Sequence, residues 1–206
     1  MRFKTLSCLI LSGAVFALTA CGGGGGNNAQ QPMGNMQQPA QGGGSGGAPY
    51  MMTDAPSGWK KIAINGTTLT FEMPPPVDAQ QVPETGEMRF ISKQGKRQFT
   101  VGVASRNSQA DKQQGISNDA ALQTWADQLL QAQAMAFEQM KLKPQIKLTG
   151  KFNTNNAQGI RYAGKVGKAD VLYIFYVTDI ALYYVEVITQ TPQAPETQQF
   201  INAFQP

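Results

Sequence analysis

Two consecutive segments near the C-terminal end of the chain are apolar on both faces of a β-strand, and this pattern restricts the fold more than any other feature. In residues 171–178 and 181–189, aliphatic and aromatic side chains occupy both alternating sets of positions. Such strands are stable only where a layer of structure covers each face of their sheet. Asp179 lies between the segments and favours a turn, so an antiparallel pair is expected.

Two segments with helical periodicity can supply these layers. Ser117, Asn118 and Asp119 favour a helix start, and apolar residues then recur at helical spacing until Pro144. Residues 195–204 predict a second, shorter helix. The predicted fold class is therefore α+β, with an antiparallel sheet covered on both faces by helices. The apolar positions are Leu122, Trp125, Leu129, Ala132, Ala136 and Met140 in the first helix, where Trp125 is expected to be buried, and Phe200, Ile201 and Phe204 in the second.

Shorter β-segments complete the predicted sheet. Residues 59–64 and 67–73 flank Asn65-Gly66, which favours a two-residue hairpin turn in which both positions have positive φ. Three prolines, residues 74–76, end the second strand. Further strands are predicted at 87–92, 99–105, 146–152 and 158–166, with turn residues between them.

The N-terminal segment has the organisation of a secretion signal. Arg2 and Lys4 precede a short apolar run that closes with Leu18-Thr19-Ala20-Cys21, and five glycines follow. The run is too short and interrupted for a membrane span. An ordinary signal peptide with a chance cysteine is the alternative.

The end of this run resembles the lipobox of bacterial lipoproteins. In that family the signal is removed before the cysteine, which is then acylated; the resemblance implies a signal peptide at 1–20 and a lipid anchor on Cys21. The residue after Cys21 is Gly22 and not Asp. In the lipoprotein sorting pattern of diderm bacteria, this resembles an outer-membrane address. The implied location is the cell envelope, at the periplasmic face of the outer membrane or the cell surface; in a monoderm it is the cell membrane.

Residues 22–56 have the composition of a tether. They consist mainly of Gly, Gln, Asn, Pro, Ala and Met with a single charge, Asp54, and show no apolar period. With Cys21, they predict a lipidated and disordered linker at 21–56. Residues 57–206 are then one domain of ordinary size, large enough for its own core.

Composition excludes several classes of active site. Histidine is absent, and the only cysteines are Cys8 in the predicted signal and Cys21. Ser-His and Cys-His nucleophiles, zinc sites of thiolate or imidazole and a disulfide are therefore not expected. The formal charge of +4 falls to +2 without Arg2 and Lys4, which is weak for binding nucleic acid. No cofactor is predicted.

Two groups of similar residues are candidate binding sites. Four methionines lie in the predicted linker, and thioethers suit Cu(I), although Met is also simply tolerated in such a coil. A basic hairpin tip could touch anionic lipid or cell-wall polymer, or could serve only solubility. The methionines are Met33, Met36, Met51 and Met52, and the tip is Lys93, Lys96 and Arg97.

Two further pairs of residues suggest polar chemistry. Glu186 is the one charge in an apolar strand, and Arg161 in a neighbouring predicted strand is its expected partner in a buried ion pair. The alternative is a polar group at a ligand cleft. Ser57 and Lys60 have Ser-x-x-Lys spacing, but a linker followed by a strand is the wrong scaffold for that chemistry.

The order of the elements carries a second resemblance. It runs from a hairpin at Trp59 through a strand ending in Met73-Pro74, a long helix, a Gly159–Tyr162 strand and a pair at Tyr183-Tyr184 to a helix ending in Phe200-x-x-x-Phe204. This order resembles the Mog1/PsbP-like α/β/α fold, including DcrB-type bacterial lipoproteins, over nearly all of 57–206. Known members bind proteins or act as extrinsic subunits of assemblies, which implies a non-catalytic role.

Three functions follow as hypotheses. The first is a lipid-anchored envelope protein that interacts with a protein partner or assembly without catalysis. The second is a lipoprotein that binds a small ligand or metal, through a cleft at the sheet edge or the tether methionines. The third, a carboxylate-based hydrolase, is the least supported, because the 13 acidic residues form no close pair in a loop.

Overall fold

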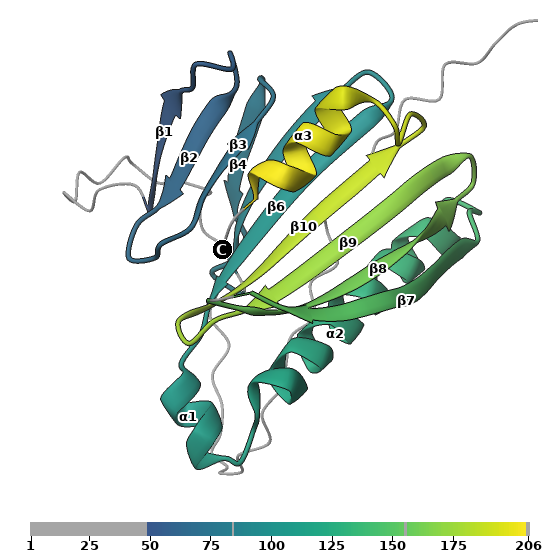
Figure 1. The fold of residues 1–206 in the computed structure, drawn as a ribbon. Helices are drawn as coiled ribbons and strands as arrows, with labels where there is room; N and C mark the ends of the chain where they lie inside the picture. The colour runs from purple at the N-terminus through teal and green to yellow at the C-terminus, as the bar shows by residue number, and fades with distance from the viewer. Residues whose placement is uncertain (1–48, 84, 155, 205–206) are drawn as a thin grey trace, which may run out of the picture.

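The computed structural model describes residues 49–83, 85–154 and 156–204, which form two antiparallel sheets and three helices (Figure 1). The small sheet has the order β1-β2-β3 and the large sheet the order β4-β5-β6-β10-β9-β8-β7. The strands are β1 (Tyr50–Asp54), β2 (Lys60–Ile64), β3 (Thr70–Met73), β4 (Val77–Gln81), β5 (Met88–Gln94), β6 (Arg97–Ser105), β7 (Pro144–Asn153), β8 (Gln158–Val166), β9 (Ala169–Val177) and β10 (Ala181–Thr189). The helices are α1 (Ser108–Gln113), α2 (Asn118–Gln139) and α3 (Pro195–Ala203).

The predicted apolar pair forms the centre of the large sheet. β9 and β10 pair antiparallel, with Tyr173 opposite Glu186 and Ile174 opposite Val185. Because alternate residues face opposite sides, these two pairs define the two faces. We call the face of Tyr173 the α2 face and the face of Ile174 the α3 face. Nearly every residue of both strands is buried, as the apolar pattern predicts.

The layers on the two faces differ from the prediction. On the α2 face, Leu122, Ala126 and Phe137 of α2 pack over β7, β8 and β9. On the α3 face, α3 shares the covering layer with the whole small sheet, so the expectation of helices alone is wrong there (Figure 1). The ring centroids of Phe99 and Phe200 lie 4.7 Å apart, and those of Phe71 and Phe90 lie 5.5 Å apart.

Proline and turn chemistry explain why the N-terminal strands form a separate sheet. The prolines at 74–76 follow β3 directly and lack the N–H groups needed to continue a ladder. The predicted two-residue turn at Asn65-Gly66 is wrong, because Ala63 pairs with Thr70 and the N–H of Ile64 donates to Leu69. Only Gly66 has positive φ in this four-residue loop.

β1 corrects the predicted boundary between linker and domain. Tyr50 pairs with Ile64 on β2, and its ring packs edge-on against Phe90 at 5.0 Å between centroids. Residues 50–56 therefore belong to the folded domain rather than to the predicted linker at 21–56. The strand was missed because it is short and carries polar residues, so no period stands out. The predicted signal peptide, Cys21 and linker residues 22–48 lie outside the described residues.

This boundary leads to a testable difference between two truncations. A chain that begins at residue 49 is expected to keep the melting temperature of the longer chain. A chain that begins at Ser57 loses β1 and the Tyr50 ring contact, which is worth about 3 kcal/mol for a packed aromatic side chain and lowers the melting temperature by several degrees. Thermal unfolding of both truncations tests this. Equal melting temperatures would show that β1 adds nothing to the core.

Candidate functional site

An open groove on the α3 face has the size and lining to receive a ligand. In Figure 1, α3 lies over β6 and beside β10, and no helix covers the neighbouring β8 and β9 on that side. The groove has a volume of about 540 Å³, within the usual range of ligand sites, but it is open rather than enclosed. Ala163, Leu172, Val187 and Ile201 provide its apolar floor and wall.

The charges around this groove are unbalanced. Lys165 and Asp170 form an ion pair at 3.1 Å between Nζ and Oδ1. Arg161 on β8 also lines the groove, is exposed, and forms no salt bridge with any described residue. The groove therefore offers an unpaired guanidinium beside apolar surface, which suits a carboxylate carried next to an apolar group.

The predicted ion pair between Arg161 and Glu186 is wrong. Arg161 lies opposite Ile174, which lies opposite Val185, so Arg161 is on the α3 face. Glu186 lies opposite Tyr173 and is on the α2 face. The sheet itself separates the two side chains. The alternation of residues along each strand was visible in the sequence, but the register that decides which faces coincide was not.

Glu186 is nevertheless a buried carboxyl group, with 3% of its surface exposed. It lies between Thr100 on β6 and Tyr173 on β9. Burial raises the pKa of Glu186, while the polar side chains of Thr100 and Tyr173 and the charge of Arg89 lower it in part. The Oε1 atom of Glu186 and the hydroxyl of Tyr173 are buried without a hydrogen-bond partner among residues 49–204 that the structure describes.

Glu186→Gln is expected to change how stability depends on pH. Because the folded pKa is raised, the native protein holds a proton that the unfolded chain has released, and wild-type stability falls as pH rises from about 4.5 through the folded value. Each unit of upward shift costs about 1.4 kcal/mol. Gln cannot ionise, so this loss is absent in the variant. Chemical unfolding of both proteins between pH 4 and pH 8 should show the free energy of unfolding of the variant increasing relative to that of the wild type as pH rises.

Glu196→Gln is the matched control for this prediction. The backbone N–H of Glu196, and then Arg97, lower the pKa of the exposed Glu196 carboxyl group. The contribution of Glu196 to stability therefore has the opposite sign to that of Glu186 and is lost as pH falls. Parallel stability curves for the wild type and Glu186→Gln would contradict the assignment of Glu186.

The predicted basic tip is only partly free. Arg97 donates from Nη1 to Oε2 of Glu196 at 2.8 Å, so it ties the β5–β6 hairpin to the start of α3. Lys93 and Lys96 remain exposed. Two lysines are a weak anionic-surface site, because each exposed base contributes about 1 kcal/mol at most and is screened by salt.

The other sequence candidates do not assemble into sites. Met51 is 61% exposed, whereas the side chain of Met52 packs on the core, so neighbouring residues of β1 point to opposite sides and cannot share one copper ion. Met33 and Met36 lie outside the described residues. Ser57 donates to Oε2 of Glu72, and Lys60 donates to Asp54, so the Ser-x-x-Lys pair is not joined.

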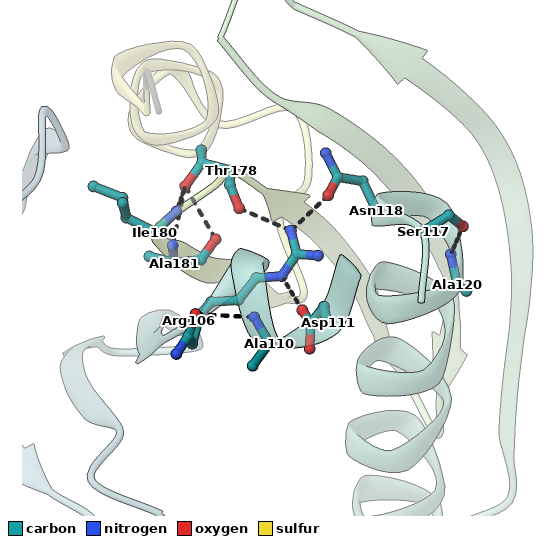
Figure 2. A network of polar contacts seen from close by, with 10 residues as sticks. Arg106, Ala110, Asp111, Ser117, Asn118, Ala120, Thr178, Ile180 and Ala181 are labelled. Carbon is teal, nitrogen blue, oxygen red and sulfur yellow. Dashed lines mark hydrogen bonds and ion pairs between the residues drawn. The ribbon is translucent and has the colours of Figure 1, made fainter. Parts of the chain in front are cut away.

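Sequence reasoning missed Arg106, a polar side chain that joins four parts of the fold (Figure 2). Its guanidinium donates from Nε to Asp111 at 2.7 Å and from Nη1 to the Asn118 side chain at 2.8 Å and the Thr178 carbonyl at 2.9 Å. These bonds join the end of β6 to α1, α2 and the β9–β10 turn. Nothing in the sequence marks this arginine, because its partners lie 5, 12 and 72 positions away on three different elements, and only the packing of those elements brings them together.

An aromatic cluster lies under α2 on the α2 face. Trp125, which was predicted to be buried, is only partly buried, and its ring packs on Phe175 at 5.6 Å and on Tyr184 at 5.7 Å between centroids. Tyr183 and Trp59 belong to the core of the other face. These aromatic side chains therefore form no common binding wall.

Within the described part of the chain, no helix is both long and apolar enough to cross a membrane. No cluster of three or more acidic, cysteine or histidine side chains suited to a metal is present in those residues either. A search against models of known protein families finds no match, and a search of curated proteins finds no significant similarity.

Proposed function

We propose that the protein is a lipid-anchored, non-catalytic interaction module of the bacterial cell envelope, and that the groove beside α3 receives a segment of a protein partner. The observation that carries this proposal is the open, apolar groove beside the unpaired Arg161. An open groove suits a polypeptide segment better than a small molecule, which usually has most of its surface enclosed.

The charge of the groove defines the chemistry of the partner. A segment that places a carboxylate at Arg161 and an apolar side chain over Leu172 and Ile201 satisfies both parts of the surface. The resemblance of the element order to the Mog1/PsbP-like fold supports the same class, since its known members bind proteins or serve as extrinsic subunits. A small carboxylate-bearing amphiphile is the second candidate ligand, because the groove volume of about 540 Å³ would accommodate one.

Site-specific photo-crosslinking in intact cells tests the groove. A photoreactive residue at Gln193, which lines the groove, should capture one discrete protein, whereas the same residue at the exposed Gln128 of α2 should not. Capture should be lost in Arg161→Glu and kept in Lys112→Glu, a matched charge reversal on α1. Capture that survives Arg161→Glu would contradict the proposal. A higher melting temperature with fatty-acid carboxylates, without protein capture, would favour the small ligand.

The lipid anchor has its own test. Cys21→Ala is expected to prevent incorporation of acyl label and to release the protein from the membrane fraction, because the apolar segment that ends at Cys21 is not long enough to hold it there. Fractionation and metabolic labelling measure both effects. A variant that remains labelled and membrane-bound would show that Cys21 is not the anchor.

A further inference from the structure

One edge of the small sheet, that of β1, is not paired with any strand that the structure describes and carries outward-pointing backbone groups. In the β1–β2 ladder, the N–H of Asn65 donates to the Pro49 carbonyl at 3.0 Å, and the N–H of Ala55 donates to the Trp59 carbonyl at 2.8 Å. Inward and outward groups alternate along an antiparallel strand. The backbone N–H and C=O groups of Met51 and Thr53 therefore point toward β2. Those of Tyr50, Met52 and Asp54 point to the side of β1 that no described strand occupies.

No described strand or helix covers that side of β1, which lies at the outer limit of the fold (Figure 1). A strand edge of this kind is a template for another strand unless charges, prolines or a bulge block it. β1 carries a single charge, Asp54, which is already paired with Lys60 of its own sheet.

The β7 edge of the large sheet is better protected. β7 carries Lys147 and Lys151 and has an irregular register between Leu148 and Gly150. Charges and irregularities of this kind limit edge-to-edge pairing. β4 at the other edge has one charge, Asp78, and a proline on either side, as β1 has Asp54 between Pro49 and Pro56.

We infer that the free edge of β1 is a self-association surface, on which two copies of this chain pair β1 with β1 in antiparallel register about Met52. In this register Met52 lies opposite Met52 of the second copy, and Tyr50 lies opposite Asp54. All outward N–H and C=O groups of the three residues then find partners, because each hydrogen-bonded pair exchanges two bonds.

The side chains are compatible with this register. Asp54 of each copy faces Tyr50, so no like charges are opposed. Met51, which is 61% exposed in the single chain, lies beside Thr53 of the second copy and loses exposed apolar surface. The strand is thus complementary to itself, which is why a second copy is the occupant that fits. This surface is separate from the groove beside α3.

Cysteine cross-linking reads out this register in intact cells with the full chain. Met51→Cys and Thr53→Cys chains, with different epitope tags, are co-expressed and oxidised. Residues 51 and 53 form a non-hydrogen-bonded pair with about 4.5 Å between Cα atoms, within disulfide range, whereas 51 to 51 is a diagonal of about 7–8 Å. The expected product is the mixed 51–53 dimer in excess of either like pair. The chain with only its native cysteines corrects for cross-linking through Cys8 or Cys21.

Proline substitution separates self-association from folding. Met52→Pro removes an N–H on the free side and leaves the bonds to β2 in place, so the 51–53 product should be lost while resistance to proteolysis is kept. If that variant is proteolysed, the Met51→Lys/Thr53→Lys pair, both exposed, replaces it as the blocking change and is read by formaldehyde cross-linking of the full chain. Three results would each overturn the inference. The mixed 51–53 product is absent, it is no more abundant than the like pairs, or cross-linking survives in a blocked variant that is folded.

Discussion

Replacing Arg106 with alanine is expected to lower the free energy of unfolding by about 3 kcal/mol, at the lower end of what is lost when one partner of a buried ion pair is removed. Only 4% of the Arg106 side chain is exposed, and its partner Asp111 is 26% exposed, which places the effect at this lower end. The substitution also leaves the Asn118 oxygen and the Thr178 carbonyl without their donor.

Arg97→Ala is the control for this prediction. Arg97 pairs with Glu196 at 2.8 Å, a similar length, but both side chains are more exposed, so about 1 kcal/mol or less is expected. The loss for Arg106→Lys should lie between those of the two alanine variants, because an ammonium group cannot donate in all the directions that the planar guanidinium does. Chemical denaturation measures all three. Equal losses for Arg106→Ala and Arg97→Ala would show that the network in Figure 2 does not support the fold.

Gly102→Ala is expected to lower the free energy of unfolding by about 2–3 kcal/mol, because the added methyl group overpacks the core. A Cβ atom at Gly102 would lie 1.9 Å from Cε1 of Tyr184. The Tyr184 ring has little room to move, because it is fully buried and packs against Trp125 and Phe175 at 5.7 and 6.2 Å between centroids. The Tyr184 ring therefore occupies the space that a side chain at position 102 of β6 would need.

Two further variants isolate this contact. Gly150→Ala places the same methyl group on the same sheet where no atom lies within 4 Å, so stability should hardly change. In the Tyr184→Leu background, Gly102→Ala should cost clearly less than in the wild type, because the atoms that clash are gone. An unchanged cost in that background would place the origin of the effect elsewhere.

The sequence was sufficient for the elements whose pattern is strong and local. β8 and β10 have the predicted limits, because turn residues flank both segments and β10 is a continuous run of apolar, strand-forming residues. α2 begins after Ser117, whose side chain accepts from the N–H of Ala120 at 3.1 Å, as the capping residues predict (Figure 2). β1, β4 and α1 were missed, since they have five, five and six residues and too few apolar positions to show a period.

The sites depended on tertiary structure instead. The sequence showed that Glu186 lies in an apolar strand and therefore in the interior, but its neighbours follow from the register of β6, β9 and β10. Arg161 was assigned to the wrong face for the same reason, since a shift of one residue in register moves a side chain through the sheet. The groove exists because α3 lies over β6 and leaves parts of β8, β9 and β10 open beside it (Figure 1).

Composition by itself determined that this chain contains no histidine and only two cysteines, and the pattern of apolar residues predicted two strands buried on both faces. Only the tertiary structure decided which polar groups meet. Local patterns reflect the environment of each residue along its own element, whereas Arg106 gathers partners from α1, α2 and the β9–β10 turn, up to 72 positions away in the chain. Such contacts follow from how the elements pack, and no period within a single segment encodes them.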